Sequence, residues 1–118
     1  MITVQGVAVN SKSAEAPIKT KGDSFIPLAV NVSGQKDKPK WETLRVYASD
    51  EAELNQVREL IADRKSIIVK SVSDLFTRTY SKDGEVRATV SFSTNLRQVQ
   101  AYDNDTREWK ALTEILKA

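Results

Sequence analysis

The chain has 118 residues, of which 40% are apolar and 29% charged, a size and balance typical of one globular domain with a single core. It contains neither cysteine nor histidine, so disulfides, thiol nucleophiles, thiolate metal sites and the commonest acid-base group are excluded. The net charge is only +2, from 18 basic and 16 acidic residues, so affinity for a polyanion would have to come from segregation of charge.

Catalytic motifs are also missing. The sequence has no glycine-rich loop of the kind that binds phosphates and no convincing pair of carboxylates, so we expect no enzyme, no cofactor and no bound metal. Residues 1–4 lack the basic start and long apolar region of a signal peptide, and no apolar run reaches the length of a membrane span. We expect a cytoplasmic protein without membrane contact.

The first half of the chain reads as strands joined by loops. Residues 2–9 are predicted to form the first strand, with Gly6 at a bulge or bend. Residues 25–32 form the second strand, and Pro27, which has no N–H to donate, predicts an edge or a bulge there. Residues 33–40 are polar and contain three lysines, which predicts a mobile basic hairpin loop.

The third predicted strand, residues 40–48, has two different faces. Its inner row is apolar and suits a buried core: Leu44, Val46 and Ala48. Its outer row alternates flat rings with a hydroxyl and a guanidinium: Trp41, Thr43, Arg45 and Tyr47. Such a row can stack bases and neutralise phosphates. The alternative is an ordinary exposed sheet face whose tryptophan packs under a loop.

A helix and a long hairpin are predicted next. Asp50 can cap a helix whose apolar stripe is Leu54, Val57, Leu60 and Ile61 and which ends near residues 63–65. Residues 66–81 form a long strand with a bend near 71–74, and the Asp83-Gly84 pair predicts a hairpin turn into a returning strand over 85–94. Beyond the bend three large side chains share one face: Phe76, Arg78 and Tyr80.

The C-terminal segment favours a helix. Residues 103–108 are acidic, but Arg107 and Glu108 stand where a calcium-binding loop needs an oxygen ligand and a glycine, so we reject a calcium site. We predict a helix from about Thr106 to Lys117 with an apolar stripe of Trp109, Leu112, Ile115 and Leu116. Trp109 is accordingly assigned to helix packing.

The order of these elements predicts a mainly β fold, the five-stranded Greek-key barrel called the OB-fold, with one internal helix between the third and fourth strands and a C-terminal helix. We expect a nucleic-acid-binding domain over residues 1–102 and a helical extension over 103–118. Barrels of this kind commonly bind oligonucleotides on one sheet face, with hairpin loops as walls.

Four segments also resemble a known family. These segments are residues 25–31, Trp41 with 46–48, residues 66–69 and residues 78–87, and in this order they resemble the bacterial-type single-stranded DNA-binding proteins over roughly residues 1–102. The resemblance implies that Trp41, Tyr47 and Tyr80 match the family's stacking aromatics. The chain lacks two family features, a further tryptophan near Gly34 and an acidic C-terminal tip, and in this it resembles a short phage- or plasmid-borne form.

We therefore expect a protein that binds single-stranded DNA without marked sequence preference, protecting it during replication, recombination or repair. Bases would stack on Trp41, Tyr47, Tyr80 and Phe76. Phosphates would pair with Arg45, Arg78, Arg87, Lys36, Lys38, Lys40 and Lys82. The resemblance implies a homo-oligomer, a dimer or a tetramer, and possible replication or recombination partners. The main alternative is a primosomal or replication-accessory OB-fold protein that acts mainly through protein contacts; an interaction module without nucleic acid and a carboxylate enzyme are less well supported by the basic, aromatic faces.

Overall fold

The computed structural model describes residues 1–117, and the side chains of Arg78 and Thr89 also lie outside its description. Its elements, in chain order, are β1 (Ile2–Asn10), β2 (Ile18–Lys19), β3 (Ser24–Asn31), β4 (Trp41–Ala48), α1 (Glu51–Arg64), β5 (Ile67–Lys82), β6 (Glu85–Asn95), the 3-10 helix η1 (Leu96–Gln98), β7 (Val99–Asp103), β8 (Glu108–Ala111) and α2 (Leu112–Leu116).

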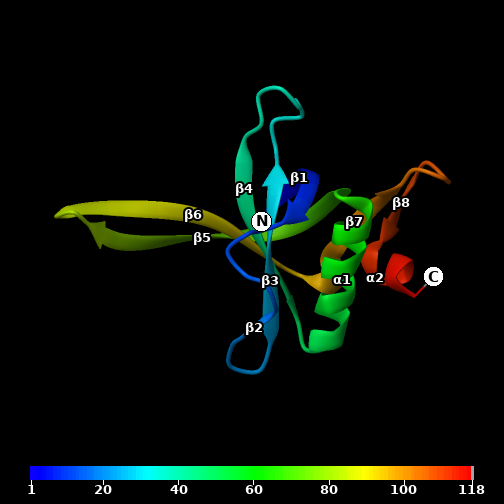
Figure 1. Ribbon diagram of the computed structural model, residues 1–118, viewed down its shortest axis with the longest axis horizontal. Coiled ribbons are helices and arrows are strands. Elements are labelled where there is room, and N and C mark those ends of the chain that lie inside the picture. Colours follow the sequence, from blue (N-terminus) through cyan, green and yellow to red (C-terminus); the bar gives the residue numbers. More distant parts are fainter. Residues whose placement is uncertain (118) are drawn as a thin grey trace.

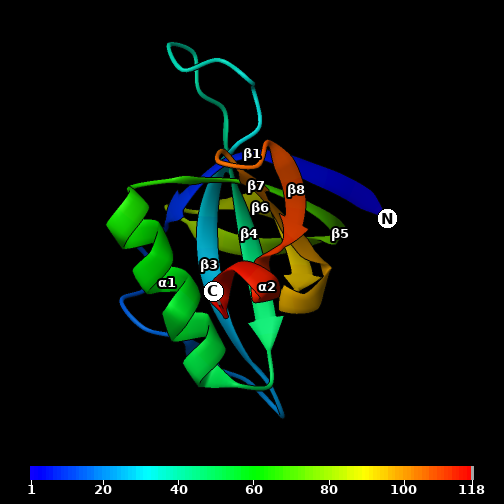
Figure 2. The same ribbon diagram turned by 90° about the vertical axis from the view of Figure 1, so that its right-hand side faces the viewer.

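Five of the strands close into a barrel. The order is β1-β3-β4-β6-β5, and the barrel closes because β5 also pairs with β1. All of these pairings are antiparallel except β4 with β6, which run parallel. Helix α1 lies between β4 and β5 in the chain and packs against one side of the barrel, beside the short α2 (Figure 2). This architecture confirms the predicted OB-fold-like barrel with one internal and one C-terminal helix.

The core forms where the inward rows of the strands meet α1. Leu44 and Val46 of β4 are buried, as their period-two spacing predicts. Three residues of the predicted helix stripe are also buried, whereas the fourth, Leu60, is only half-buried; the buried three are Leu54, Val57 and Ile61. The helix begins as predicted, because the Asp50 side chain accepts a hydrogen bond from the Ala52 amide at 2.9 Å.

Gly6 marks a close approach between β1 and β3. A Cβ at this position would overlap the carbonyl oxygen of Asn31, far inside van der Waals contact. Residue 6 sits where β1 pairs with β5, directly before its pairing with β3 begins at Val7. The glycine therefore lets the first strand pass between its two partners.

Pro27 does not lie on an edge strand, so of the two predicted alternatives, an edge or a bulge, the edge is wrong. Strand β3 is paired on both sides, with β4 along its whole length and with β1 from Leu28 onward. Pro27 falls between the end of the β1 pairing and the short β2 pairing at Phe25, and its carbonyl accepts from the Ser11 amide at 3.3 Å. At position 27 neither β1 nor β2 is paired with β3, so the proline, which has no N–H, leaves no hydrogen bond of these ladders unmade.

The two halves of strand β5 pair with different strands. Its first half, up to Ser73, pairs with β1, and from Asp74 onward it pairs with β6, so the predicted bend coincides with the change of partner. The β5–β6 hairpin then projects away from the barrel as a long arm (Figure 1). Asp83 and Gly84 close it with positive φ values of 54° and 77°, as the Asp-Gly pair predicts.

The predicted C-terminal helix is wrong in its first half. Residues 108–111 form β8, a strand paired with β7 that places Trp109 opposite Tyr102, and α2 begins only at Leu112. The physical reason is a tight turn: the Asp103 side chain accepts from the amides of residues 105 and 106, and Arg107 takes a positive φ of 57°. Trp109 thus packs edge-on against Tyr102, with ring centroids 5.5 Å apart, and not in a helix stripe.

Within residues 1–117, no helix is both long and apolar enough to cross a membrane.

Candidate nucleic-acid interface

One outward sheet face carries most of the predicted aromatic residues. Phe25 of β3 lies opposite Tyr47 of β4, and Phe76 of β5 lies opposite Ser91 of β6. Because opposed residues in a sheet share a face, and Ser91 is in register with Thr43, the outer rows of β3, β4, β6 and β5 form one continuous surface. The register therefore brings together residues far apart in sequence.

A row of rings and one cation crosses the middle of this face. The Phe25 and Tyr47 rings lie 5.0 Å apart at an interplanar angle of 38°. The Arg45 guanidinium carbon lies 4.7 Å from the centre of the Phe25 ring and 4.8 Å from that of Phe76. Rings from two different strands therefore flank Arg45, an arrangement that stabilises a cation.

Trp41 is the most exposed ring of this face, with 50% of its surface accessible. It is the first residue of β4 and pairs with Asn31, at the point where the loop between β3 and β4 joins the sheet. A shallow hollow lies beside it, lined among others by Phe25, Thr43 and Arg45. About half of the indole surface is thus accessible to a flat ligand, while residues of the loop over 33–40 share a second hollow with it.

The basic loop over residues 33–40 rises from the same end of the sheet (Figure 2), and its three lysines are all exposed: Lys36, Lys38 and Lys40. Its base is held by one side chain. The Asn31 amide oxygen accepts from the backbone amides of residues 40 and 33 at 3.0 and 3.1 Å, and its NH₂ donates to the Gln35 carbonyl at 3.0 Å. The three lysines therefore project from a pinned base.

The arm carries the remaining predicted residues. Tyr80 lies opposite Arg87 near the tip, 43% exposed, and Lys82 ends β5. Arg87 makes a weak exposed ion pair with Glu85 at 3.6 Å. Tyr80 stands four residues beyond Phe76 on the same strand, so it lies roughly 13 Å further along the arm than the central row.

Arg78 shares this side of the arm by its place in the ladder. It is paired with Thr89, between the Phe76 and Tyr80 positions. Its side chain lies outside the described part of the chain, so its predicted contact with phosphate rests on the register alone.

The reverse side of the arm is exposed, and its apolar residues lie mainly on β6, because β5 contributes Thr77, Thr79 and Ser81 there. Leu75, Val86 and Val90 share that face, and all are exposed, Val86 by 78%. At its root the same row reaches Phe92, which packs against the barrel core. The arm therefore presents one aromatic and basic side and one side on which exposed apolar residues lie beside hydroxyl side chains.

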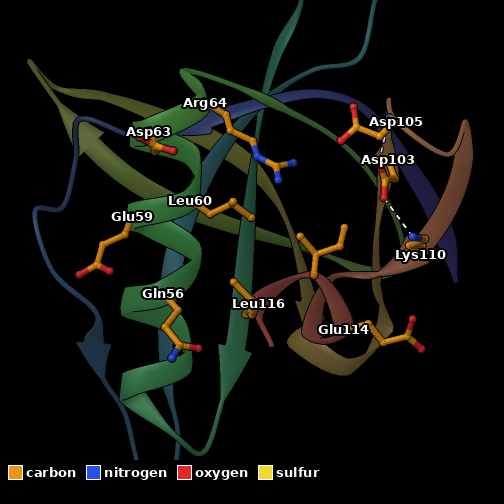
Figure 3. A pocket seen from close by; sticks show the side chains of 11 residues that line it. Gln56, Glu59, Leu60, Asp63, Arg64, Asp103, Asp105, Lys110, Glu114 and Leu116 are labelled. Atoms are coloured by element: carbon orange, nitrogen blue, oxygen red, sulfur yellow. Dashed lines mark hydrogen bonds and ion pairs between the residues drawn. The ribbon is translucent and has the colours of Figure 1, made fainter. Parts of the chain in front are cut away.

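A different surface lies between α1 and the C-terminal segment (Figure 3). Its lining is dominated by acidic side chains and holds two cations, Arg64 and Lys110; the carboxylates are Glu59, Asp63, Asp103, Asp105 and Glu114. Negative charge of this kind disfavours phosphate. Charge is thus segregated on the molecule, with the exposed lysine loop at one end of the sheet and carboxylates at this groove.

Asp103 and Lys110 form an ion pair within the groove, with Nζ 3.0 Å from Oδ2. The hydrogen bond from Lys110, helped by the Asp105 amide, holds the pKa of Asp103 below its ordinary value. The same hydrogen bond raises the pKa of Lys110. Within the described residues, no three acidic groups converge as a metal site.

Two residues of the interface do not emerge from the sequence pattern. Phe25 falls on an outward row, but its contact with Arg45 depends on the pairing register of β3 with β4. Asn31 belongs to a predicted strand, whereas its amide organises the basic loop. The signal for Asn31 is its position directly before a turn-rich segment, where asparagine side chains commonly bond to nearby backbone.

Comparison with known proteins adds no family assignment: no protein-family model matches the chain, and no curated protein is significantly similar to it.

Proposed function

We propose that this protein binds single-stranded DNA without marked sequence preference, by stacking bases on Trp41, Tyr47, Phe76 and Tyr80 and by pairing phosphates with lysines and arginines. The observation that carries the proposal is the aromatic row around Arg45 with the half-exposed Trp41 beside it, on the outer face of an OB-fold-like barrel. Rings of this kind accept any base, since every base has a flat π-face.

Charge placement supports the same proposal. The lysines of the basic loop extend from the end of the sheet where Trp41 begins β4, so a strand stacked on Trp41 would have cations within reach. The arm, with Tyr80 and Arg87 on its aromatic side, would form a second wall. We propose a binding protein and not an enzyme, acting in the cytoplasm to protect DNA during replication, recombination or repair, as a homo-oligomer and as a phage- or plasmid-type protein.

A second function is favoured by one observation. The reverse side of the arm, with Leu75, Val86 and Val90 exposed, is typical of a surface that contacts another protein. A replication-accessory protein that acts mainly through such contacts would bind DNA weakly and a protein partner tightly.

Tryptophan fluorescence tests the main proposal. Trp109→Phe leaves Trp41 as the single reporter, and oligo-dT is titrated into this variant. Binding by the same variant carrying Trp41→Ala is followed by anisotropy of a labelled oligonucleotide. We expect quenching of Trp41, a decrease of about 1 to 3 kcal/mol in binding free energy in Trp41→Ala, and weaker binding as salt rises. A wild-type protein that does not bind oligo-dT at low salt would overturn the proposal.

A further inference from the structure

Arg45 is held in an unusual position for a charged side chain at the centre of an open face. Phe25 approaches it from β3 and Phe76 from β5, with ring centres 4.7 and 4.8 Å from the guanidinium carbon. Between β4 and β5 lies β6, whose residues in this row are Ser91 and Ser93. Because serine is small, the long arginine can lie across β6 and reach the Phe76 ring.

The two rings leave a defined part of Arg45 available to a ligand. Guanidinium is planar, and aromatic rings commonly stack on its flat faces; stacked in this way by Phe25 and Phe76, Arg45 would keep its in-plane N–H donors for hydrogen bonds. Within the described residues, Arg45 takes part in no ion pair and its side chain makes no hydrogen bond to another group. Among the residues that the structure describes, no protein group therefore accepts a hydrogen bond from this fork.

A hollow adjoins this fork. Arg45 lines it together with Trp41 and Thr43, and Glu42 is also part of its lining. Arg45 stands four residues from Trp41, roughly 13 Å along β4, and both line the hollow, so a nucleotide that fills the hollow would contact both side chains. Since Arg45 is already ordered by its two rings, forming hydrogen bonds to such a nucleotide would cost little further side-chain entropy.

We infer that Arg45 fixes the position of one nucleotide by donating two parallel hydrogen bonds from its guanidinium edge to a coplanar pair of acceptor atoms. Two groups of a DNA strand present such a pair: the non-bridging oxygens of a phosphate, and O6 with N7 of a guanine. The inference rests on the proposed function and goes beyond it, because it requires arginine, and not merely positive charge, at residue 45. Lysine lacks the planar fork and would not replace it.

The test compares Arg45→Lys with the control Arg97→Lys, the same change at an exposed arginine of η1 that lies outside the proposed interface. Affinity is measured for oligo-dT and for an oligo-dT of equal length carrying isolated guanines, each over a range of salt. We expect Arg45→Lys to weaken binding about tenfold, as removal of a bidentate pair does, and Arg97→Lys to leave it nearly unchanged. A third variant, Arg45→Met, removes the positive charge at residue 45, and the salt dependence of its affinity is compared with that of wild type.

The two sources of the acceptor pair give different results. A phosphate contact predicts an equal decrease in affinity on both oligonucleotides and a salt slope lowered by about 0.7 in Arg45→Met. A guanine contact predicts that wild type prefers the guanine-containing strand and that Arg45→Lys abolishes this preference. Either pattern supports the inference.

A double-mutant cycle separates positioning from simple folding effects. Phe25→Leu removes one ring that holds Arg45 and that has no proposed stacking role, so it should weaken binding in the wild-type background and add little in the Arg45→Lys background. Arg45→Lys that binds both oligonucleotides as wild type does, while Trp41→Ala binds more weakly, would overturn the inference and leave the proposed function standing. If wild type binds neither oligonucleotide at low salt, the proposed function itself fails.

Discussion

The barrel face and the β5–β6 arm carry similar side chains on very different supports. Arg45 and Tyr47 stand on β4, whose inward residues are buried in the core, so the outer row is fixed from beneath. Tyr80 and Arg87 stand on a hairpin whose reverse side, including Val86, is exposed. A two-stranded hairpin alone is marginally stable in water. The barrel face is thus preorganised, whereas the arm depends on its own ladder of hydrogen bonds and on its turn.

Two glycine substitutions should show the difference in support between the barrel and the arm most clearly. Gly6→Ala forces a methyl group onto the Asn31 carbonyl inside the barrel, and we expect the free energy of unfolding to fall by about 1 to 3 kcal/mol. Gly84→Ala meets open space and suffers only its positive φ of 77°, a cost of about 1 kcal/mol confined to the arm. Urea unfolding followed by circular dichroism measures both. Equal decreases in the two variants would contradict the proposed difference in support.

Substitutions of two tyrosines, one on the barrel face and one on the arm, compare the two regions in binding and in stability. Tyr47→Ala and Tyr80→Ala should each weaken binding to oligo-dT, by up to about 1 to 3 kcal/mol for a stacked base. Only Tyr47→Ala should also lower the unfolding free energy, because Tyr47 packs against Phe25 in the barrel face while Tyr80 is exposed on the arm. Anisotropy and thermal unfolding give the two readouts.

A tyrosine outside the aromatic row provides the control for these variants. Tyr102 packs on Trp109 in the β7–β8 hairpin, so Tyr102→Ala should bind oligo-dT as wild type does while it loses this packing. Weaker binding by folded Tyr102→Ala would mean that the interface has been assigned to the wrong part of the sheet.

The loop lysines should have a smaller effect that depends on salt. Replacing all three by glutamine should lower the slope of log affinity against log salt by about 0.7 for each phosphate that the loop neutralises; the lysines are Lys36, Lys38 and Lys40. The free energy of unfolding should change little, since all three side chains are exposed. Lys65→Gln with Lys117→Gln, at the ends of the two helices, is the control and should leave the slope unchanged. An unaltered slope in the loop variant would remove the loop from the interface.

The smallest expected effect concerns pH and the acidic groove. Because the pKa of Asp103 is lowered, the stability that its carboxylate contributes is present above its ordinary pKa and disappears as pH falls through the lowered value. Because the pKa of Lys110 is raised, the stability that its charged side chain contributes is present below the ordinary lysine pKa and is lost only as pH rises through the raised value. Asp103→Asn should therefore lower Tm slightly at neutral pH, and the difference from wild type should vanish in strong acid. A difference that persists there would point to the β7–β8 turn and not to the ion pair.

Sequence patterns predict well the elements that local forces determine. The inward row of β4, the Asp50 cap and the Asp83-Gly84 turn depend on residues close in sequence, and the structure confirms all three. The contact of Arg45 with Phe25 and Phe76 could not be predicted, because it depends on the register of strands distant in the chain and on serines in between. Long-range pairing is the information that a period-two pattern lacks.

The wrong prediction at the C-terminus has a different physical origin. Trp109 and Leu112 have helical spacing, which favours one continuous helix, but Asp103 bonds to two backbone amides and closes a hairpin first. Side-chain bonds of this kind compete with helix formation and are not visible in hydrophobic spacing. The sequence does carry a signal for the turn, the cluster of two aspartates and an asparagine over residues 103–105, since these residue types favour turns as well as metal sites.

The hydrogen bonds of Asn31 make the tip of the basic loop replaceable. One amide joins both ends of the loop, at Ser33 and at Lys40, and residues 36–39 take no part in that closure. New sequences, insertions or chemical labels at the tip should therefore leave the barrel intact and alter only what the protein touches. Residues 36–39 can thus be exchanged to change what the loop contacts, provided that the asparagine at position 31 is kept.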